Sequence, residues 1–283
     1  METDPYVIAE IGGTHIGSLD RAKKLAKLAR LSGAHALKTQ KRNPVESVPK
    51  SLQAKPHPNE LFSYGNTYLE HRQTLELDID EHKILKKYCE EIGITYSTSV
   101  WDMTSTYETI ELNPEFIKVP SAMNHNKKML DTLIQKYAGD IHVSLGMTTK
   151  EERKELYKYV LKNPRRFVVY HCTSGYPVPF EQIYLKEIQV LKDKLESKGV
   201  RIGFSNHGKG IAIEPAAYVL GATYFERHFI DDRTFLHTDA ACSLEPQGLH
   251  KLCRDLKCIQ RSLNYKPYEM DGIEMTQRKK LRG

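Results

Sequence analysis

The feature that most constrains the fold is a set of short segments, rich in β-branched and aromatic residues, that recur roughly every 30 residues. A segment with the 3.6-residue apolar period of a helix follows each of them, for example over 19–31 and 181–198. The eight strand-like segments are 6–11, 36–40, 94–100, 116–120, 141–146, 167–172, 201–207 and 224–229. Eight such units predict a single parallel (β/α)8 TIM barrel, because each helix can cover the outer face of its strand while the inner faces fill the ring. The alternative is an open, doubly wound sheet, but the even spacing and the lack of a dinucleotide-binding fingerprint favour closure.

Helix boundaries in the sequence carry capping signals that support this division. The stretches 78–81 and 148–151 each begin with a side-chain acceptor, Asp78 or Thr148, and carry a glutamate three residues later, which is the pattern of a capping box. Glycines that can adopt a left-handed cap close helical segments just before strands, at Gly33, Gly93 and Gly199.

The 283 residues provide room for one barrel, and we predict a single TIM-barrel domain over 1–283. One long interruption, 41–77, separates the second strand from its helix and contains four prolines. A connection of this length in a compact domain is typical of a lid or binding loop. Residues 264–283 are expected to form a C-terminal tail that ends in a basic run.

Charge and cysteine content limit the partners and the compartment. Lysine and arginine exceed aspartate and glutamate by 42 to 36, but the excess is spread along helical segments, so we predict small anionic substrates and no nucleic acid. No apolar stretch reaches about 18 residues, so we expect no membrane association. Five cysteines without a Cys-x-x-Cys pair, and an acidic N-terminal stretch unlike a signal peptide, predict reduced thiols and a cytoplasmic location.

Polar side chains gather where the predicted strands end, which in such barrels is the end that carries the chemistry. Lys38 and Lys118 lie there beside several hydroxyls, a combination that suits the binding of phosphate or carboxylate. His207 and His228 follow neighbouring strands and could bind a divalent metal with open coordination positions. The residues alone therefore predict a metal-assisted enzyme for an anionic substrate. The strand-end set also includes Glu10, Gln40, Thr98, Ser121, Ser144, His171, Thr173, Ser174, Tyr176, Ser205, Asn206 and Glu226.

These motifs, in this order, resemble those of the sialic-acid synthase family, which comprises N-acetylneuraminate synthases and their pseudaminate and legionaminate relatives. The matching runs are IAEIG (8–12), GS (17–18), ALKTQ (36–40), KVPS (118–121), SLGM (144–147), HCTSGYPVP (171–179), SNH (205–207), ERHF (226–229) and SLEP (243–246). The resemblance implies an enzyme that condenses phosphoenolpyruvate with an open-chain N-acyl aminosugar, which yields a nonulosonic acid and phosphate.

The resemblance also implies roles for individual residues. A divalent metal, Mn²⁺ or Mg²⁺, would lie on His207 and His228, and Asp239 would lie near the metal-bound water or aldehyde. Lys38 and Lys118, with the metal histidines and Asp239, would form the catalytic set. Phosphoenolpyruvate would bind at Lys38, Thr98, Lys118, Ser121, Ser144 and Ser205, whereas Gln40, Tyr176 and Asp239 would face the sugar; Ser174 is a further substrate-binding candidate.

Several positions depart from the family pattern. Ile16 stands where a polar residue is typical, Met123 where many members have a carboxylate that holds the sugar, Ser174 where some have Asn, and Asn206 where Asp is typical. With the sequence ending at Gly283, we expect the family's small C-terminal antifreeze-like domain to be absent, so a homodimer would need another interface. The substituted positions mostly face the sugar, so the condensation chemistry is predicted and the particular sugar is not.

The long interruption could compensate for these losses, because Asn66 and Arg72 could grip the polyol and its acyl group; alternatively, this segment only covers the barrel rim. Two other functions stay open. The barrel could be an aldolase or lyase that uses Lys38 or Lys118 as a Schiff base, or a binding protein for an anionic metabolite that has lost catalysis.

Overall fold

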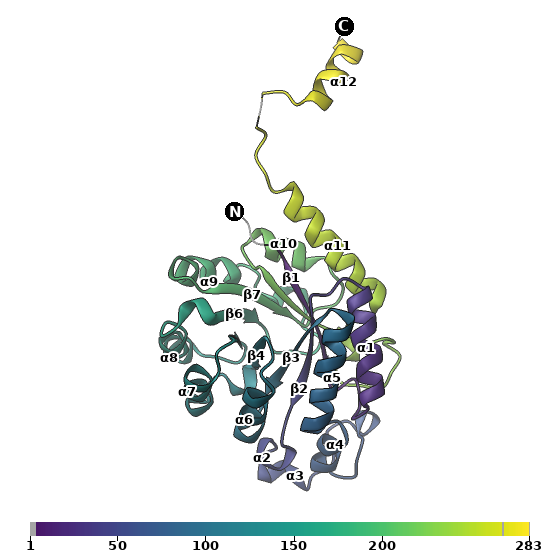
Figure 1. Cartoon of the computed structure of the whole chain (residues 1–283), viewed down its shortest axis with the longest axis vertical. Coiled ribbons are helices and arrows are strands. Elements are labelled where there is room, and N and C mark those ends of the chain that lie inside the picture. Colours follow the sequence, from purple (N-terminus) through teal and green to yellow (C-terminus); the bar gives the residue numbers. More distant parts are fainter. Residues whose placement is uncertain (1–3, 268, 283) are drawn as a thin grey trace.

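Eight parallel strands close into a barrel in the computed structural model, which describes residues 4–267 and 269–282. Each strand pairs with the next in the sequence, and β1 pairs with β8, so the predicted (β/α)8 fold is confirmed and the open sheet is excluded (Figure 1). Residues 1–3 of the acidic N-terminal stretch, residue 268 of the tail and Gly283 lie outside the described part. The strands are β1 Tyr6–Gly12, β2 Ala36–Lys41, β3 Thr95–Val100, β4 Phe116–Val119, β5 Asp140–Ser144, β6 Phe167–Cys172, β7 Arg201–Asn206 and β8 Tyr224–His228.

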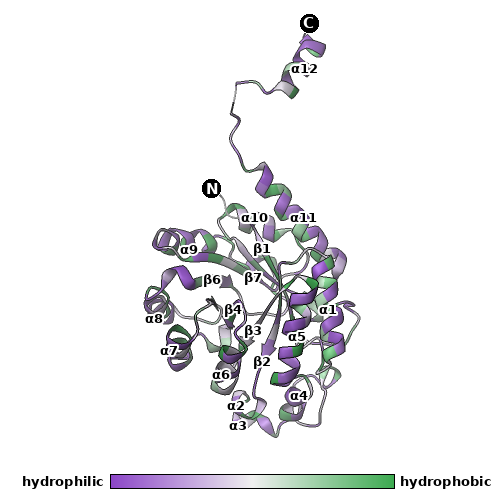
Figure 2. Cartoon of the chain, viewed as in Figure 1, coloured by the Kyte–Doolittle hydropathy of each residue, from purple (hydrophilic) through white to green (hydrophobic). Residues whose placement is uncertain are grey.

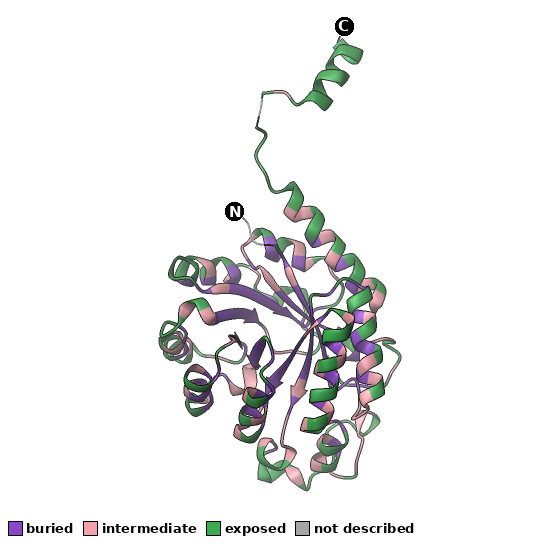
Figure 3. Cartoon of the chain, viewed as in Figure 1, coloured by how far each residue is buried: buried purple, intermediate pink, exposed green. Residues whose placement is uncertain are grey.

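A ring of helices covers the outside of the barrel. Their inward faces are apolar and their outward faces are polar and exposed, as in α1, where Ala22, Leu25, Ala26 and Ala29 are buried (Figures 2 and 3). This alternation buries each helix against its strand. The ring consists of α1 Leu19–Leu31, α5 Ile79–Ile92, α6 Met103–Leu112, α7 Lys127–Lys136, α8 Lys150–Val160, α9 Glu187–Leu195, α10 Ile213–Val219 and α11 Pro246–Ser262.

Most of the predicted helix boundaries are confirmed. Asp78 and Glu81 form the capping box of α5, and Gly93 ends this helix with φ 73°. The second predicted box is wrong by one residue, because Thr149 and Glu152 form it. The hydroxyl of Thr148 instead donates to the carbonyl of Leu145 at 2.5 Å, and it is therefore not available to cap the helix.

The N-terminal end of the barrel interior is filled by buried apolar and aromatic side chains. Ile8, Ala36, Phe116, Val168 and Tyr170 form a buried cluster there. His142 stacks on the ring of Phe116 with 3.9 Å between the centroids and hydrogen-bonds to the hydroxyl of Tyr170 at 2.8 Å, so its role is structural. Only the C-terminal end of the barrel remains for a polar site.

The predicted interruption, residues 41–77, lies between β2 and α5 and folds into short helices; we call it the inserted segment. The phenol of Tyr64 donates to the carbonyl of Leu236 at 2.6 Å, which ties this segment to the connection after β8. Leu75 and Leu77 are buried in the core, so its C-terminal part is anchored. The short helices are α2 Pro44–Ser47, α3 Lys50–Gln53, the 3-10 turn Glu60–Phe62 and α4 Tyr68–Thr74.

The predicted tail contains one helix, α12, which spans Gly272–Arg282 and is exposed along its length (Figure 3). Within the described residues, none of the helices combines the length and the apolar character needed to cross a membrane.

Gly17 makes the turn between β1 and α1 compatible with the inserted segment. It has φ 60°, and a Cβ there would lie 2.3 Å from the backbone oxygen of Thr74. We expect Gly17→Ala to lower the free energy of unfolding by about 2–4 kcal/mol, because backbone strain and a backbone clash add together. Urea denaturation would measure the loss. The control is Gly248→Ala, whose Cβ would lie 3.5 Å from its nearest neighbour and which should not destabilise the fold; equal stability of the two variants would contradict the clash.

Candidate active site

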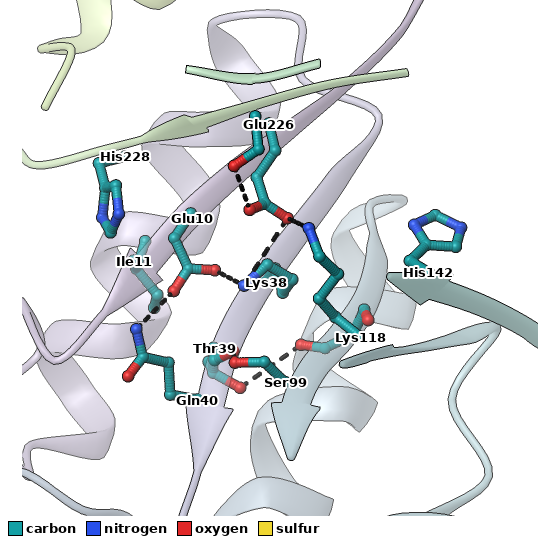
Figure 4. Close-up of polar contacts among 12 residues, drawn as sticks. Glu10, Ile11, Lys38, Thr39, Gln40, Ser99, Lys118, His142, Glu226 and His228 are labelled. Carbon is teal, nitrogen blue, oxygen red and sulfur yellow. Dashed lines mark hydrogen bonds and ion pairs between the residues drawn. The ribbon is translucent and has the colours of Figure 1, made fainter. Parts of the chain in front are cut away.

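Four ionisable side chains meet inside the C-terminal end of the barrel (Figure 4). The ammonium of Lys118 on β4 lies 2.8 Å from a carboxylate oxygen of Glu226 on β8. Lys38 on β2 is ion-paired with Glu10 on β1, and it lies 3.8 Å from Glu226. All four side chains are buried. Two lysines and two glutamates, carried by β1, β2, β4 and β8, therefore neutralise one another inside the barrel.

The network shifts the titration of its members. Burial raises the pKa of Glu10 to about 7, against the opposing effect of Lys38. Burial also disfavours the charge of Glu226, but Lys118 and Lys38 outweigh it and lower the pKa of this carboxyl. Burial lowers the pKa of Lys118, whereas for Lys38 the two glutamates outweigh burial and raise it. The site thus holds one carboxyl with a pKa near neutrality, which is suited to moving a proton.

Serine hydroxyls converge beside the lysines, around the backbone of Gly146 after β5. A Cβ at residue 146 would lie 2.3 Å from the hydroxyl oxygen of Ser174 and 2.5 Å from that of Ser121, so only glycine leaves both hydroxyls in place. Ser144 ends β5 and is buried. The hydroxyl of Ser205 donates to Glu226 at 3.0 Å. Hydroxyl donors and lysines in one place form a cradle suited to an anion.

Two imidazoles face each other across the other side of the site. The rings of His207 and His228 have centroids 5.3 Å apart, and the ring of Tyr176 lies 4.2 Å from that of His207. His207 Nδ1 hydrogen-bonds to the carbonyl of Thr173 at 3.1 Å, which would leave its Nε2 as a ligand atom.

The residues around this pair fit a metal with open coordination positions. Nδ1 of His228 is buried without a hydrogen-bond partner and lies 3.6 Å from a carboxylate oxygen of Asp239. Burial lowers the pKa of His228 to about 4, so its imidazole is neutral, as a ligand must be. Within residues 4–267 and 269–282, no three His, Cys, Asp or Glu side chains are grouped to hold an ion. The chain therefore offers two imidazoles, and substrate or water would complete the coordination.

An amide and a carboxylate border the site on the side of β1 and β2. Gly12 has φ 42°, and a Cβ there would lie 3.1 Å from the amide nitrogen of Gln40 and 3.5 Å from a carboxylate oxygen of Asp239. Gln40 donates to Glu10 at 3.2 Å. Burial opposes the charge of Asp239, but His228 and His237 outweigh it and lower its pKa. An ionised carboxylate and an amide are suited to binding sugar hydroxyls.

These groups surround one cavity, which we call the central pocket. It brings together nine of the predicted site residues, while Asp239 and Ser174 contact the lining residues His228 and Cys172 without lining it themselves. The lining residues are Glu10, Lys38, Gln40, Ser99, Trp101, Lys118, Pro120, Ser121, Ala122, Ser144, Met147, Cys172, Tyr176, Ser205, His207, Glu226 and His228.

Thr98 is the predicted strand residue that the structure turns away from the central pocket. Side chains alternate along a strand, and Ser99 faces the pocket, so Thr98 points to the helices. Tyr96, on the same side as Thr98, hydrogen-bonds to His82 of α5 at 2.5 Å. Thr98 therefore does not line the central pocket, whereas its neighbour Ser99 does.

The candidates in the inserted segment do not line the central pocket. Asn66 is exposed before α4, its backbone N–H donates to Glu70 at 2.8 Å, and it does not line the pocket, so a role in gripping the sugar stays a prediction. Arg72 is mostly buried next to the pocket, where it pairs with Glu76 at 2.7 Å.

Glu10 and Glu226 are the most important residues that the predicted site omitted, although both were recognised as strand-end polar residues. The signal that could have found them is electrostatic: two lysines at strand ends inside a barrel need carboxylates nearby. Two of the departures have structural explanations, since Met123 packs against the apolar core and Asn206 donates to the buried Glu214 at 2.7 Å.

Comparison with known proteins identifies the class of this site. Residues 25–267 match the NeuB family, so the chain belongs to that family. It is 33% identical to N-acetylneuraminate-9-phosphate synthase of Homo sapiens, over 98% of this chain and 76% of that protein. It is 34% identical to N,N'-diacetyllegionaminic acid synthase of Campylobacter jejuni, over 95% of this chain and 78% of that protein.

A solved structure agrees with this assignment. The N-acetylneuraminic acid synthetase of Leptospira borgpetersenii superposes with a TM-score of 0.82 at 26% identity, covering 99% of this chain and 93% of that one. The chain is therefore an enzyme of the NeuB family of synthases, as the sequence motifs predicted.

The charge network makes Glu226 essential for stability. We expect Glu226→Gln to lower the free energy of unfolding by about 3–5 kcal/mol, because Lys118 and Lys38 lose their shared carboxylate while buried. Urea denaturation would measure the change, with the exposed Glu111→Gln as control, expected within about 0.5 kcal/mol of the unsubstituted protein. A loss for Glu226→Gln as small as that of the control would contradict the proposed neutralisation.

Proposed function

We propose that this enzyme condenses phosphoenolpyruvate with an open-chain aldose, an N-acyl aminosugar, to give a nonulosonic acid and phosphate. The observation that carries the proposal is the division of the central pocket. The pocket combines two sets of groups: the buried lysines with the serines, which we call the lysine side, and the two imidazoles together with Gln40 and Asp239, which we call the imidazole side. The names of the relatives, synthases of N-acetylneuraminate 9-phosphate and of legionaminic acid, support the same reaction class.

Phosphoenolpyruvate is assigned to the lysine side. Lys38 and Lys118 supply the cationic donors for its phosphate and carboxylate, and the anion would replace part of their pairing with Glu226. The remaining donors are the hydroxyls of Ser99, Ser121, Ser144, Ser174 and Ser205. Such contacts mainly fix the orientation of the enol double bond, and that positioning is a large part of catalysis.

The sugar is assigned to the imidazole side. His207 and His228 would hold a divalent cation, Mn²⁺ or Mg²⁺, which when bound would polarise the aldehyde. Gln40 and Asp239 would hydrogen-bond the sugar hydroxyls, and Tyr176, next to His207, would cover the reacting end.

The reaction joins C3 of phosphoenolpyruvate to the aldehyde carbon, so that a carbon–carbon bond forms and the aldehyde oxygen becomes a hydroxyl. Water then adds at C2, and the C2–O bond to phosphate breaks. Glu10, whose carboxyl has a pKa of about 7 and touches both Lys38 and Gln40, is placed to move the proton between water and product.

The lysine contacts favour this reaction over a Schiff-base mechanism. Both ammonium groups are paired with carboxylates, which supports charged, anion-binding lysines rather than a neutral nucleophile. Borohydride reduction in the presence of a keto acid should therefore leave the enzyme untrapped.

The decisive assay measures inorganic phosphate release. We expect release only when phosphoenolpyruvate, an N-acyl aminosugar and a divalent metal are all present, and we expect a chelator to abolish it. His228→Ala should lower kcat/KM by at least about 100-fold, whereas His142→Ala, away from the central pocket, tests whether loss of a barrel histidine alone has this effect. Metal-independent turnover by the unsubstituted enzyme would refute the assignment of the imidazoles.

The hydroxyl cradle generates a separate prediction. Gly146→Ala should raise KM for phosphoenolpyruvate about 10-fold or more, because its Cβ displaces the hydroxyls of Ser121 and Ser174. Steady-state kinetics with the sugar saturating would measure it, and Gly248→Ala should keep the original KM. An unchanged KM in Gly146→Ala would remove Ser121 and Ser174 from the anion site.

A further inference from the structure

Two arginines next to the central pocket share a single carboxylate. Arg72 of α4 lies 2.7 Å from a carboxylate oxygen of Glu76, and Arg42, just after β2, approaches the same oxygen at 3.9 Å. In the described part of the chain, no other carboxylate pairs with either guanidinium. The side chain of Arg42 is only 14% exposed, and that of Arg72 only 11%. Asp239 acts on both guanidiniums only at longer range, so Glu76 is the single carboxylate in direct contact with two cations in a poorly solvated place.

The arginines keep unused donors. Nε of Arg42 and Nε of Arg72 are both buried and have no hydrogen-bond partner within the described residues. Burial and repulsion from Arg72 lower the pKa of Arg42 to about 9, so its guanidinium is still charged at neutral pH. A purely structural role, holding the inserted segment through Glu76, would need only one of these cations.

Arg42 lies directly beyond the proposed sugar-binding wall. Its guanidinium donates to the side-chain oxygen of Gln40 at 2.5 Å. The guanidinium carbon, Cζ, lies 3.4 Å from the ring centroid of Trp101, which lines the central pocket. Gln40 in turn contacts Glu10, inside the pocket. A sugar with its aldehyde at the imidazoles and its hydroxyls at Gln40 would point its far end toward the two arginines.

We infer that Arg42 and Arg72 bind a phosphate group at the far end of the sugar, so that the substrate is an aminosugar phosphate. The inference rests on the proposed condensation reaction and specifies its second substrate. A phosphate supplies a second negative charge in direct contact and several acceptors that match the planar guanidinium donors, whereas a neutral hydroxyl supplies no charge. Trp101 keeps the Arg42 guanidinium in place by stacking.

The test uses a panel of N-acetylhexosamines of gluco, manno and galacto configuration, each free and as the 6-phosphate. Consumption of phosphoenolpyruvate is followed with the full chain and Mn²⁺. We expect kcat/KM for at least one 6-phosphate to exceed that for its free sugar by about 10-fold or more. Arg42→Gln should lower kcat/KM for that phosphate about 10- to 100-fold, with KM for phosphoenolpyruvate within about 2-fold.

Two further variants separate binding from general effects. Arg42→Lys retains the charge and should recover part of the activity with the phosphorylated sugar. Lys209→Gln removes an exposed cation that follows β7 at the same end of the barrel, and it should change kcat/KM by less than about 2-fold.

The outcomes distinguish this inference from the proposed function. If free sugars react as well as their phosphates, or if Arg42→Gln slows both equally, the arginines are structural and the inference is wrong, while the condensation stands. If no sugar supports consumption of phosphoenolpyruvate, the proposed function is wrong. Calorimetric titration of the 6-phosphates then decides the inference separately: weaker binding by Arg42→Gln supports it, and equal binding or none to the unsubstituted protein overturns it.

Discussion

Burying two lysines inside a barrel is possible only if carboxylates are buried with them, and this requirement organises the whole site. Desolvating an unpaired ammonium costs several kcal/mol, more than most single interactions in a domain contribute. Glu10 and Glu226 remove that cost, and they do so from β1 and β8, the two strands that close the barrel. The same two strands therefore close the sheet and carry the carboxylates that neutralise the lysines. An anionic substrate meets lysines whose positions are already fixed by carboxylates.

The other end of the barrel supports this arrangement with closely packed side chains. Ile8, Phe116 and Tyr170 fill the interior below the ionic network, and the ring of Tyr170 lies 3.8 Å from the ammonium of Lys118. A cation on an aromatic face is stabilised without a competing hydrogen bond. The lysine is therefore held from below by an aromatic ring and from the side by Glu226, which leaves it directed into the central pocket.

The sequence was sufficient to predict the barrel and most of the pocket because both depend on regular spacing. Lys38 and Gln40 are two residues apart on one strand, so if one faces the interior the other does too. Thr98 shows where this reasoning stops. It lies between two serines, so three consecutive hydroxyls give no hint of which face is inward. The direction is set by Tyr96 and its hydrogen bond to His82, a contact between a strand and a helix that the local sequence does not encode. The shift of a cap from Thr148 to Thr149 has a similar cause, because a backbone carbonyl in the preceding turn captured the first hydroxyl.

The same constraint indicates where differences between members of such a family can be accommodated. Inward positions near the strand ends are committed to the charge network, and changing one leaves a buried charge unpaired. Met123, at a position where a sugar-binding carboxylate was expected, packs against the core instead. Arg42, which donates to Gln40, comes from the segment between β2 and α5, as do Arg72 and Glu76, which pair with each other. This segment forms its own short helices, and Arg42 reaches the network through Gln40, which contacts Glu10. Under the proposed reaction, a change in the sugar can therefore be accommodated by this segment, one contact away from the buried charges.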